Sequence, residues 1–183
     1  MRDLVVTENI SLDGVIDASA GWFSPAGGEV DLSEMEQALA EQREAADAFL
    51  VGRVTFEQMR SYWPTLTDDT TGITDYLDRV AKYVVSSTMT DPGWQGSTVL
   101  ADLEAVRDLK ATPGGDIVCT GSVRLVQSLV AADLVDEYRL FVYPTVVGRG
   151  GRLFEGASIP ALDPVTVRGF PSGHALLTYR PHR

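Results

Sequence analysis

The fold class is decided by one stretch of the chain, Ala48-Phe49-Leu50-Val51-Gly52-Arg53-Val54-Thr55-Phe56-Glu57. An apolar run with the length of a buried strand ends at Gly52, and Arg53 and Thr55 then offer a cation and a hydroxyl where a helix is expected to start. Unpaired backbone N–H groups at a helix N-terminus carry a partial positive charge, and the forked donors of arginine fit a phosphate. The stretch therefore predicts an α/β protein with a phosphate at this junction. A tight turn with a solvated arginine is the alternative.

Length and composition are those of an ordinary globular protein. The chain has 183 residues, of which 44% are hydrophobic and 22% charged, so we expect a single domain over residues 1–183. The formal net charge of -11 opposes binding to nucleic acid, because such binding depends on lysines and arginines that displace counterions from phosphates. We expect no membrane partner and a cytoplasmic location, since neither a membrane-length apolar segment nor a secretory signal pattern is readable.

Disulfide and metal chemistry have little support in the sequence. Cys119 is the single cysteine and lies in the apolar run Ile117-Val118-Cys119-Thr120, so it is expected to be a packed strand residue. The two histidines, His174 and His182, lack the H-x-x-x-H or H-E-x-x-H spacing of zinc ligands. The sequence therefore predicts no metal site.

Short apolar runs alternate with helix-length segments along most of the chain. Strands are expected at residues 3–10, 48–52, 83–86, 98–100 and 116–120. Helices are expected after an N-cap at Asp31 or Ser33, after Gly52, over residues 102–109 with Asp102 as N-cap, and over residues 122–132. This alternation is typical of a mostly parallel sheet.

The pattern changes after residue 137. Two longer strands, 138–147 and 175–179, are linked by glycine-rich and proline-rich turns without room for crossover helices. The end of the sheet is therefore expected to be antiparallel. Residues 65–74 are polar and turn-rich and are expected to form a surface loop.

Two more segments follow expected strands, at the place where open α/β sheets bind ligands. Ser86 and Ser87 supply hydroxyls that can bond a ribose phosphate, although a plain turn is the alternative. Gly121 allows the backbone to approach a diphosphate, and Ser122 can cap the helix that follows. Together with the Gly52 junction, these segments favour a dinucleotide. A G-x-G-x-x-G sequence is absent after the first strand, which argues against the usual Rossmann mode.

The loop after the first strand is the candidate substrate region. It carries the carboxylate of Asp13, for which a simple Asx-type turn is the alternative. Residues 17–29 surround Trp22 with small and flexible residues, so we expect a lid that closes over a planar ring. Alternatively, its aromatic residues fix the loop to the core or to another subunit. Tyr62, at the end of the helix after Gly52, faces the same cleft or belongs to the core.

Several motifs, in this order, resemble the dihydrofolate reductase superfamily, and more closely its branch related to the C-terminal reductase domain of bacterial riboflavin-biosynthesis deaminase-reductases. The motifs are Ser11-Leu12-Asp13-Gly14, Val51-Gly52-Arg53-Val54-Thr55-Phe56-Glu57, Val84-Val85-Ser86-Ser87, Gly121-Ser122, Leu134-Val135-Asp136-Glu137 and the run Tyr143-Pro144-Thr145-Val146-Val147-Gly148-Arg149-Gly150-Gly151-Arg152-Leu153-Phe154. The resemblance covers nearly the whole chain. It implies the three-layer dihydrofolate reductase-like fold, NADPH as cofactor, and a homodimer.

The resemblance also implies which residues hold NADPH. Gly52, Arg53 and Thr55 would meet its phosphates. Ser86 and Ser87 would meet the adenosine end. The diphosphate would lie at the next helix start, against Gly121, Ser122 and Val123.

Two departures from the family pattern limit what the resemblance implies about the substrate. Dihydrofolate reductases carry a single acid on the first long helix, whereas several acids compete for that place here: Asp31, Glu34, Glu36 and Glu41. Riboflavin-pathway reductases often have a lysine after the Ser-Leu-Asp-Gly motif, but this chain has Val15 there and no Lys or Arg between Arg2 and Arg43. A phosphorylated substrate is therefore poorly served, and a neutral or amino-bearing heterocycle fits better.

The resulting hypothesis is an NADPH-dependent oxidoreductase that transfers a hydride to a pteridine-like or pyrimidine-like heterocycle. Asp13 and Asp31 are the candidate catalytic residues, and Trp22 and Tyr62 the candidate substrate contacts. Two alternatives stay open. One is the 5-amino-6-(5-phosphoribosylamino)uracil reductase of riboflavin biosynthesis, and the other is a non-catalytic nucleotide-binding module.

Overall fold

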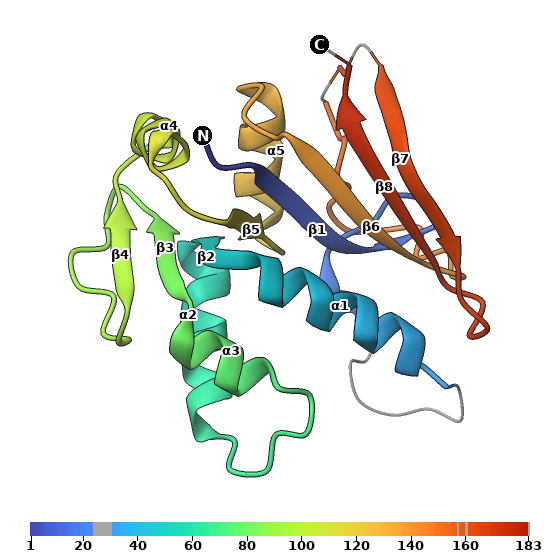
Figure 1. The fold of residues 1–183 in the computed structure, drawn as a ribbon, viewed down its shortest axis with the longest axis horizontal. Helices are drawn as coiled ribbons and strands as arrows, with labels where there is room; N and C mark the ends of the chain where they lie inside the picture. Colours follow the sequence, from blue (N-terminus) through green and yellow to red (C-terminus); the bar gives the residue numbers. More distant parts are fainter. Residues whose placement is uncertain (24–30, 157, 160, 183) are drawn as a thin grey trace.

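The chain forms one eight-stranded sheet with helices on both faces (Figure 1). The computed structural model describes residues 1–23, 31–156, 158–159 and 161–182. The strands are β1 Leu4–Ser11, β2 Ala46–Gly52, β3 Ala81–Val85, β4 Ser97–Leu100, β5 Asp116–Cys119, β6 Glu137–Tyr143, β7 Leu162–Gly169 and β8 Ala175–Pro181. The helices are α1 Ser33–Ala45, α2 Arg53–Tyr62, α3 Ile73–Arg79, α4 Leu103–Ala111 and α5 Val123–Ala131, with short 3-10 turns at Ala18–Ala20 and Trp63–Thr65.

The strand order is β4-β3-β2-β5-β1-β6-β8-β7. Strands β1 to β6 are parallel to one another, whereas β8 runs antiparallel to β6, and β7 antiparallel to β8. The carboxyl ends of the six parallel strands therefore meet at one edge of the sheet, called here the carboxyl edge; the opposite edge is the amino edge. The predicted mostly parallel sheet with antiparallel C-terminal strands is confirmed.

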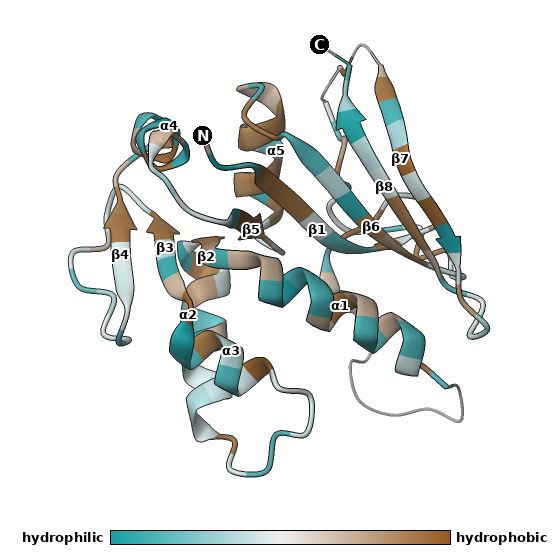
Figure 2. Ribbon diagram, in the orientation of Figure 1, coloured by the Kyte–Doolittle hydropathy of each residue, from teal (hydrophilic) through white to brown (hydrophobic). Residues whose placement is uncertain are grey.

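The packing of strand β2 explains why its residues are apolar at successive positions. Ala48 and Leu50 pack in the same cluster as the buried residues of α4 and α5. Phe49 and Val51 point to the other face and pack with Phe56 of α2 and with α3. A strand covered by helices on both faces has no solvent side, so alternation disappears. Figure 2 shows hydrophobic residues concentrated on the central strands β1, β2 and β5.

Helix α1 covers the part of the sheet that contains β6. Its residues Met35 and Ala38 are buried and pack in one cluster with Phe141 and Tyr143. Further along the helix, Gln42 accepts a hydrogen bond of 2.9 Å from the Thr7 hydroxyl of β1. These contacts place α1 on the same face as α2 and α3, opposite α4 and α5, which gives three layers (Figure 1).

Some predicted elements have different limits in the structure. The strand expected over 138–147 ends at Tyr143, because Pro144 follows and has no N–H for the ladder. The region expected to be a loop up to residue 74 already contains the start of α3 at Ile73. Strand β7 was not anticipated; it lies at the end of the sheet and most of its residues are exposed. Asp102 caps α4 as expected, by accepting from the N–H of Ala105.

Cys119 is fully buried in the core, as its apolar neighbours predicted. None of the helices in the described part of the chain is both long and apolar enough to cross a bilayer.

Candidate functional site

Two helix N-termini lie side by side at the carboxyl edge. Helix α2 begins after Gly52, at the end of β2, and α5 begins after Ser122, which follows β5. The Gly52 N–H donates a hydrogen bond of 2.8 Å to the Ser122 hydroxyl. A Cβ atom at Gly52 would lie 3.2 Å from the Ser122 side chain, so glycine permits this close approach. Neither helix start has a side-chain cap, so both present backbone N–H groups and a partial positive charge.

The Gly121–Ser122 turn has an unusual backbone. Both residues are left-handed, with φ of 61° and 63°. Glycine adopts this region freely, but for a serine it costs roughly 1–2 kcal/mol. The serine hydroxyl was expected to cap its own helix, and it accepts from Gly52 instead. Strain of this kind is found where a backbone is held in shape for a ligand.

Thr55 and Val123 complete the two helix starts. A Cβ atom at Gly121 would lie 3.4 Å from the Thr55 methyl group, so the first turn of α2 packs against the turn before α5. On the other side, a Cβ atom at Gly151 would lie 2.6 Å from Val123. The loop that contains Gly151 therefore lies directly against the start of α5.

Beneath the Gly121 turn lies Glu8, a residue that the sequence analysis missed. Its Oε2 accepts a hydrogen bond of 3.1 Å from the Gly121 N–H. The residue is 3% exposed, and its Oε1 has no hydrogen-bond partner among the residues that the structure describes. Burial raises the pKa of this carboxyl from 4.5 to about 8, although the Gly121 hydrogen bond acts in the opposite direction.

A signal for Glu8 was present in the sequence. On a strand, residues two apart share a face, so Glu8 shares its face with Leu4, Val6 and Ile10. All three are apolar and belong to the same core cluster. A lone acid in such a row is a buried carboxyl, and buried carboxyls call for an explanation.

Arg53, Ser86 and Ser87 lie on the β3 side of the Gly52 junction. Val85 is the register partner of Gly52, so the two serines follow directly beside α2. The Ser86 hydroxyl accepts from the N–H groups of Thr88 and Met89, which is the plain turn anticipated as the alternative, while Ser87 is exposed. Arg53 is half exposed and forms an ion pair of 3.3 Å with Glu57, one helical turn away.

Asp13 joins two loops at the end of β1. Its carboxylate accepts hydrogen bonds from the Ser11 hydroxyl at 2.7 Å, and from the N–H groups of Val147 and Gly148 at 3.0 and 2.8 Å. These donors hold the pKa of Asp13 well below its usual range. The Arg152 guanidinium also donates to Asp13, at its backbone carbonyl and its carboxylate. Asp13 therefore fixes the loop after β6 against the loop after β1.

An open cleft of about 380 Å³ adjoins this loop pair. Trp22 forms one wall and residues 145–149 the other. The indole N–H of Trp22 donates to the Asp17 carbonyl at 2.7 Å, and its ring contacts Phe23 and Tyr143 edge to face. Of the predicted lid over 17–29, residues 24–29 lie outside the described residues.

The remaining two predicted residues lie at helix ends. Asp31 precedes α1, is exposed, and accepts from the N–H of Ser33 at 2.9 Å; the side chain and then the backbone N–H of Ser33 lower the pKa of its carboxyl. Leu32 beside it packs on the same cluster as Trp22. Tyr62, in contrast, ends α2, about 14 Å along the helix from Arg53. Its ring is stacked edge to face on Trp63.

Comparison with known proteins agrees with this architecture. The profile of the RibD C-terminal domain matches residues 2–176. The chain belongs to the RibD C-terminal domain family. The uncharacterized protein YyaP of Bacillus subtilis (strain 168) is 29% identical over 184 residues, which cover 97% of this chain and 94% of YyaP.

Two solved structures share the fold of this family member. The crystal structure of a putative riboflavin biosynthesis protein from Shewanella sp. PV-4 superposes with a TM-score of 0.73 at 21% identity and covers 100% of both chains. Dihydrofolate reductase from Enterococcus faecalis, complexed with NADP(H), gives a TM-score of 0.65 at 18% identity over 99% of this chain and 97% of that chain. The dihydrofolate reductase-like fold is confirmed, and the family relationship groups the chain with the reductases of that superfamily.

Proposed function

We propose that this protein is an NADPH-dependent reductase that acts on a pteridine-like or pyrimidine-like heterocycle. The observation that carries the proposal is the pair of uncapped helix starts, joined by the Gly52–Ser122 hydrogen bond at the carboxyl edge. A dinucleotide has phosphates at two places, and the edge offers two adjacent sets of N–H donors. Family membership supports an oxidoreductase, and the Enterococcus faecalis structure shows this fold with NADP(H) bound.

The described residues fit the cofactor along its length. Gly52, Arg53 and Thr55 would hold the phosphate of the adenosine half, because they combine helix N–H groups, a guanidinium and a hydroxyl. Ser86 and Ser87 would contact the adenosine end. On the α5 side, the diphosphate would be held by Gly121, Ser122 and Val123. The Gly121 N–H donates to Glu8 beneath the turn, so the N–H groups of Ser122 and Val123 at the start of α5 would be the ones to meet the diphosphate.

The cleft beside Trp22 is the proposed substrate pocket. NADPH, when bound, supplies a hydride to a C=N or C=O bond of the heterocycle. Trp22 would cover the planar ring, and Asp13 would hold the opposite wall of the pocket in place by fixing residues 147 and 148. Asp31 lies beside the cluster that holds Trp22, and its lowered pKa keeps the carboxylate ionised, so we propose that it accepts a hydrogen bond from a ring N–H of the substrate. Tyr62, at the far end of α2, does not line this cleft, so it has no part in the proposed pocket.

One observation favours the reductase step of riboflavin biosynthesis as a second candidate. Arg149 lines the cleft, where a sugar phosphate would need a cation. The stretch between Arg2 and Arg43 holds no Lys or Arg for this task. Arg149 supplies one from the loop after β6.

Two measurements test the proposal. Calorimetric titration with NADPH and NADH measures cofactor binding, and single-turnover loss of NADPH absorbance is then followed with a panel of pterins, flavin precursors and aminopyrimidines. Binding followed by turnover of a neutral heterocycle supports the proposal. Turnover of the phosphoribosyl substrate alone favours the second candidate. Binding without turnover on any compound favours a non-catalytic nucleotide-binding module, and failure to bind either cofactor rejects the proposal.

A further inference from the structure

Glu8 is a buried acid placed directly behind the proposed diphosphate turn. Its register partner on β6 is Leu140, and the apolar face of α5 covers the same side of the sheet. One carboxyl oxygen accepts from the Gly121 N–H at 3.1 Å, while the other is buried and finds no partner in the described part of the chain. A structural carboxylate is expected to have all its lone pairs satisfied, so this half-satisfied group calls for a role beyond packing.

The charge state of Glu8 acts directly on the start of α5. In the neutral form, Oε1 carries the proton and Oε2 accepts from Gly121, so the turn is held without adding charge. In the ionised form, a negative charge lies one hydrogen bond away from the N–H groups that would face a phosphate. Within the low-dielectric core, this charge opposes a bound diphosphate strongly.

We propose that Glu8 is a positioning residue that supports cofactor binding only while it carries its proton, so that loss of this proton releases the cofactor. The inference rests on the proposed cofactor site and adds a pH dependence to it. Because Glu8 contacts Gly121 and not the reacting atoms, it acts on affinity through the shape and charge of the turn.

The groups around Glu8 favour a single titration step. The thiol of Cys119, on the neighbouring strand β5, lies on the same face of the sheet as Glu8. Burial raises the pKa of that thiol well above its ordinary value. The thiol is therefore neutral throughout the pH range in which Glu8 titrates. Leu140 and the packed residues of α5 carry no charge, and neither do Gly121 and Ser122. The pKa of Glu8, about 8, places its ionisation just above neutral pH.

The test is the dissociation constant of NADPH between about pH 7 and pH 9.5, a range in which the phosphate groups, with a second pKa near 6, stay fully ionised. For the wild type we expect a constant dissociation constant at first. Above the pKa of Glu8, it should then rise by up to tenfold per pH unit, because one proton is linked to binding. Glu8→Gln keeps the size and both hydrogen-bonding functions without a titratable proton, so its profile should be flat. Cys119→Ala is the matched control and should keep the wild-type profile.

A second measurement needs only the wild-type protein, so it remains valid even if the Glu8→Gln variant does not fold. Calorimetry of NADPH binding at about pH 8.5, in two buffers with different ionisation heats, counts protons directly. Uptake of a large fraction of one proton by the wild type supports the proposal. Zero uptake overturns it, as does a Glu8→Gln profile that rises like the wild type. If wild-type protein binds NADPH at no pH, the proposed function and this inference both fail, whereas binding that is independent of pH rejects only the role of Glu8.

Discussion

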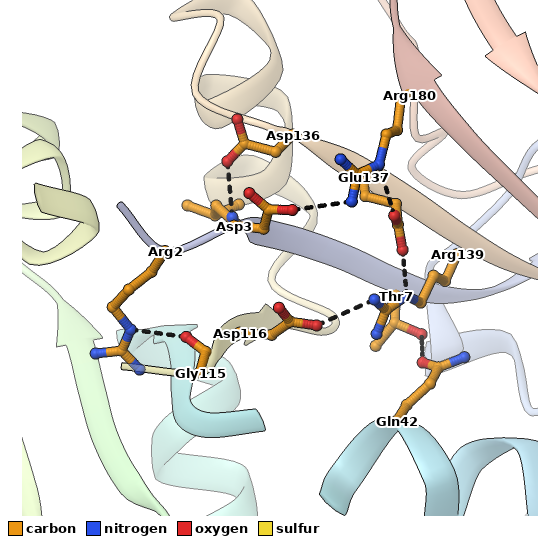
Figure 3. Close-up of polar contacts among 11 residues, drawn as sticks. Arg2, Asp3, Thr7, Gln42, Gly115, Asp116, Asp136, Glu137, Arg139 and Arg180 are labelled. Carbon is orange, nitrogen blue, oxygen red and sulfur yellow. Dashed lines mark hydrogen bonds and ion pairs between the residues drawn. The ribbon is translucent and has the colours of Figure 1, made fainter. Parts of the chain in front are cut away.

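Charged groups are paired with one another at the amino edge of the sheet, whereas polar groups at the carboxyl edge are left partly unpaired. At the amino edge, the acids and cations of this chain satisfy one another (Figure 3). Glu137 is buried and accepts from Arg139 at 2.5 Å and from Arg180 at 2.9 Å. Arg180 also reaches Asp3, and Arg139 also reaches Asp116, so five charged groups from β5, β6, β8 and the residue before β1 form one closed network. At the carboxyl edge, within the described residues, one oxygen of Glu8 has no partner and two helix starts have no side-chain cap.

This difference separates stability from function within one sheet. A closed network of ion pairs leaves nothing for a ligand to bind, and its removal exposes unpaired buried charge. Open helix starts and a half-satisfied acid do not stabilise the fold, and the open helix starts offer an anion N–H groups that would otherwise bond to water. The amino edge therefore holds the strands together, and the carboxyl edge is the surface where chemistry is expected.

Replacement of a buried glutamate by glutamine should change the free energy of unfolding in opposite directions at the two edges. In the folded protein Glu8 keeps its proton up to about pH 8, compared with about 4.5 for an ordinary glutamate. Folding therefore takes up a proton between these values, and the free energy of unfolding falls as the pH rises. At pH 7, the raised pKa of Glu8 lowers the free energy of unfolding by about 3 kcal/mol. We expect Glu8→Gln to be more stable than the wild type by about this amount at pH 7, and equally stable near pH 4.5.

Glu137→Gln should lower the free energy of unfolding by about 2–3 kcal/mol at pH 7, because it leaves Arg139 facing an amide that cannot accept from both guanidinium groups. Urea unfolding curves of both variants and the wild type, at several pH values, give the comparison. Destabilisation by both substitutions, or by neither, would contradict the distinction between the two edges. NADPH affinity at pH 7 should stay unchanged in Glu137→Gln, since its network lies at the opposite edge from the proposed site.

Arg53 tests whether the carboxyl edge recognises the extra phosphate of NADPH. Charge-assisted hydrogen bonds contribute about 1.5–3 kcal/mol, so Arg53→Ala should weaken NADPH binding by roughly one to two orders of magnitude and change NADH binding much less. The exposed pair with Glu57 contributes only about 0.3–0.5 kcal/mol to folding, so stability should hardly change. Parallel titrations of both cofactors at fixed salt provide the measurement, and Glu57→Gln is the control for loss of the ion pair alone. Equal losses for the two cofactors would reject the phosphate role of Arg53.

The sequence predicted much of this architecture because the central strands carry their signal locally. The run around Leu50 is apolar at every position and ends at a glycine, which suffices to predict a buried strand and the helix after it. Strand β7 gave no such signal. It contains Pro164, and the alternation that follows, Val165-Thr166-Val167-Arg168, spans only four residues whose apolar side is exposed, so the pattern is too short to mark a half-buried strand.

The site was predictable only in its separate parts. Glycine turns after the strands indicated both helix starts, and these do lie at one edge. Gly52 bonds to Ser122, 70 residues further along, because strands β2 and β5 are neighbours in the sheet. No local sequence pattern encodes this strand order. The same holds for Asp13, which was predicted to act on the loop or the substrate, with a local turn as the alternative: it accepts from the nearby Ser11 hydroxyl and also from the N–H of Gly148, far along the chain.

Asp13→Asn should impair turnover while leaving NADPH affinity unchanged. Asparagine keeps one acceptor oxygen, but its amide would face an N–H of Val147 or Gly148, which is a donor against a donor. The cleft wall would then shift, and small displacements near reacting groups cost about ten- to a hundredfold in rate. Single-turnover kinetics at saturating NADPH measure the effect, and Asp17→Asn, a carboxylate on the same segment, is the control. Unchanged turnover would assign Asp13 to the turn alone.

The smallest effect on folding is expected at β7, where we expect the homodimer to form. This strand ends the sheet, so beyond it no strand of the described chain completes the ladder, and Val165 and Val167 are 54% and 67% exposed. Exposed apolar edge strands are prone to pairing, and a second copy would cover this one. Val167→Lys should change the free energy of unfolding of the protomer by less than about 0.5 kcal/mol, since an exposed side chain loses little packing. It should nevertheless convert the dimer to a monomer in sedimentation at micromolar concentration. Gln58→Lys places the same charge on α2 and should leave the dimer intact. A wild type that sediments as a monomer would reject the dimer, and a dimer that survives Val167→Lys would move the interface away from β7.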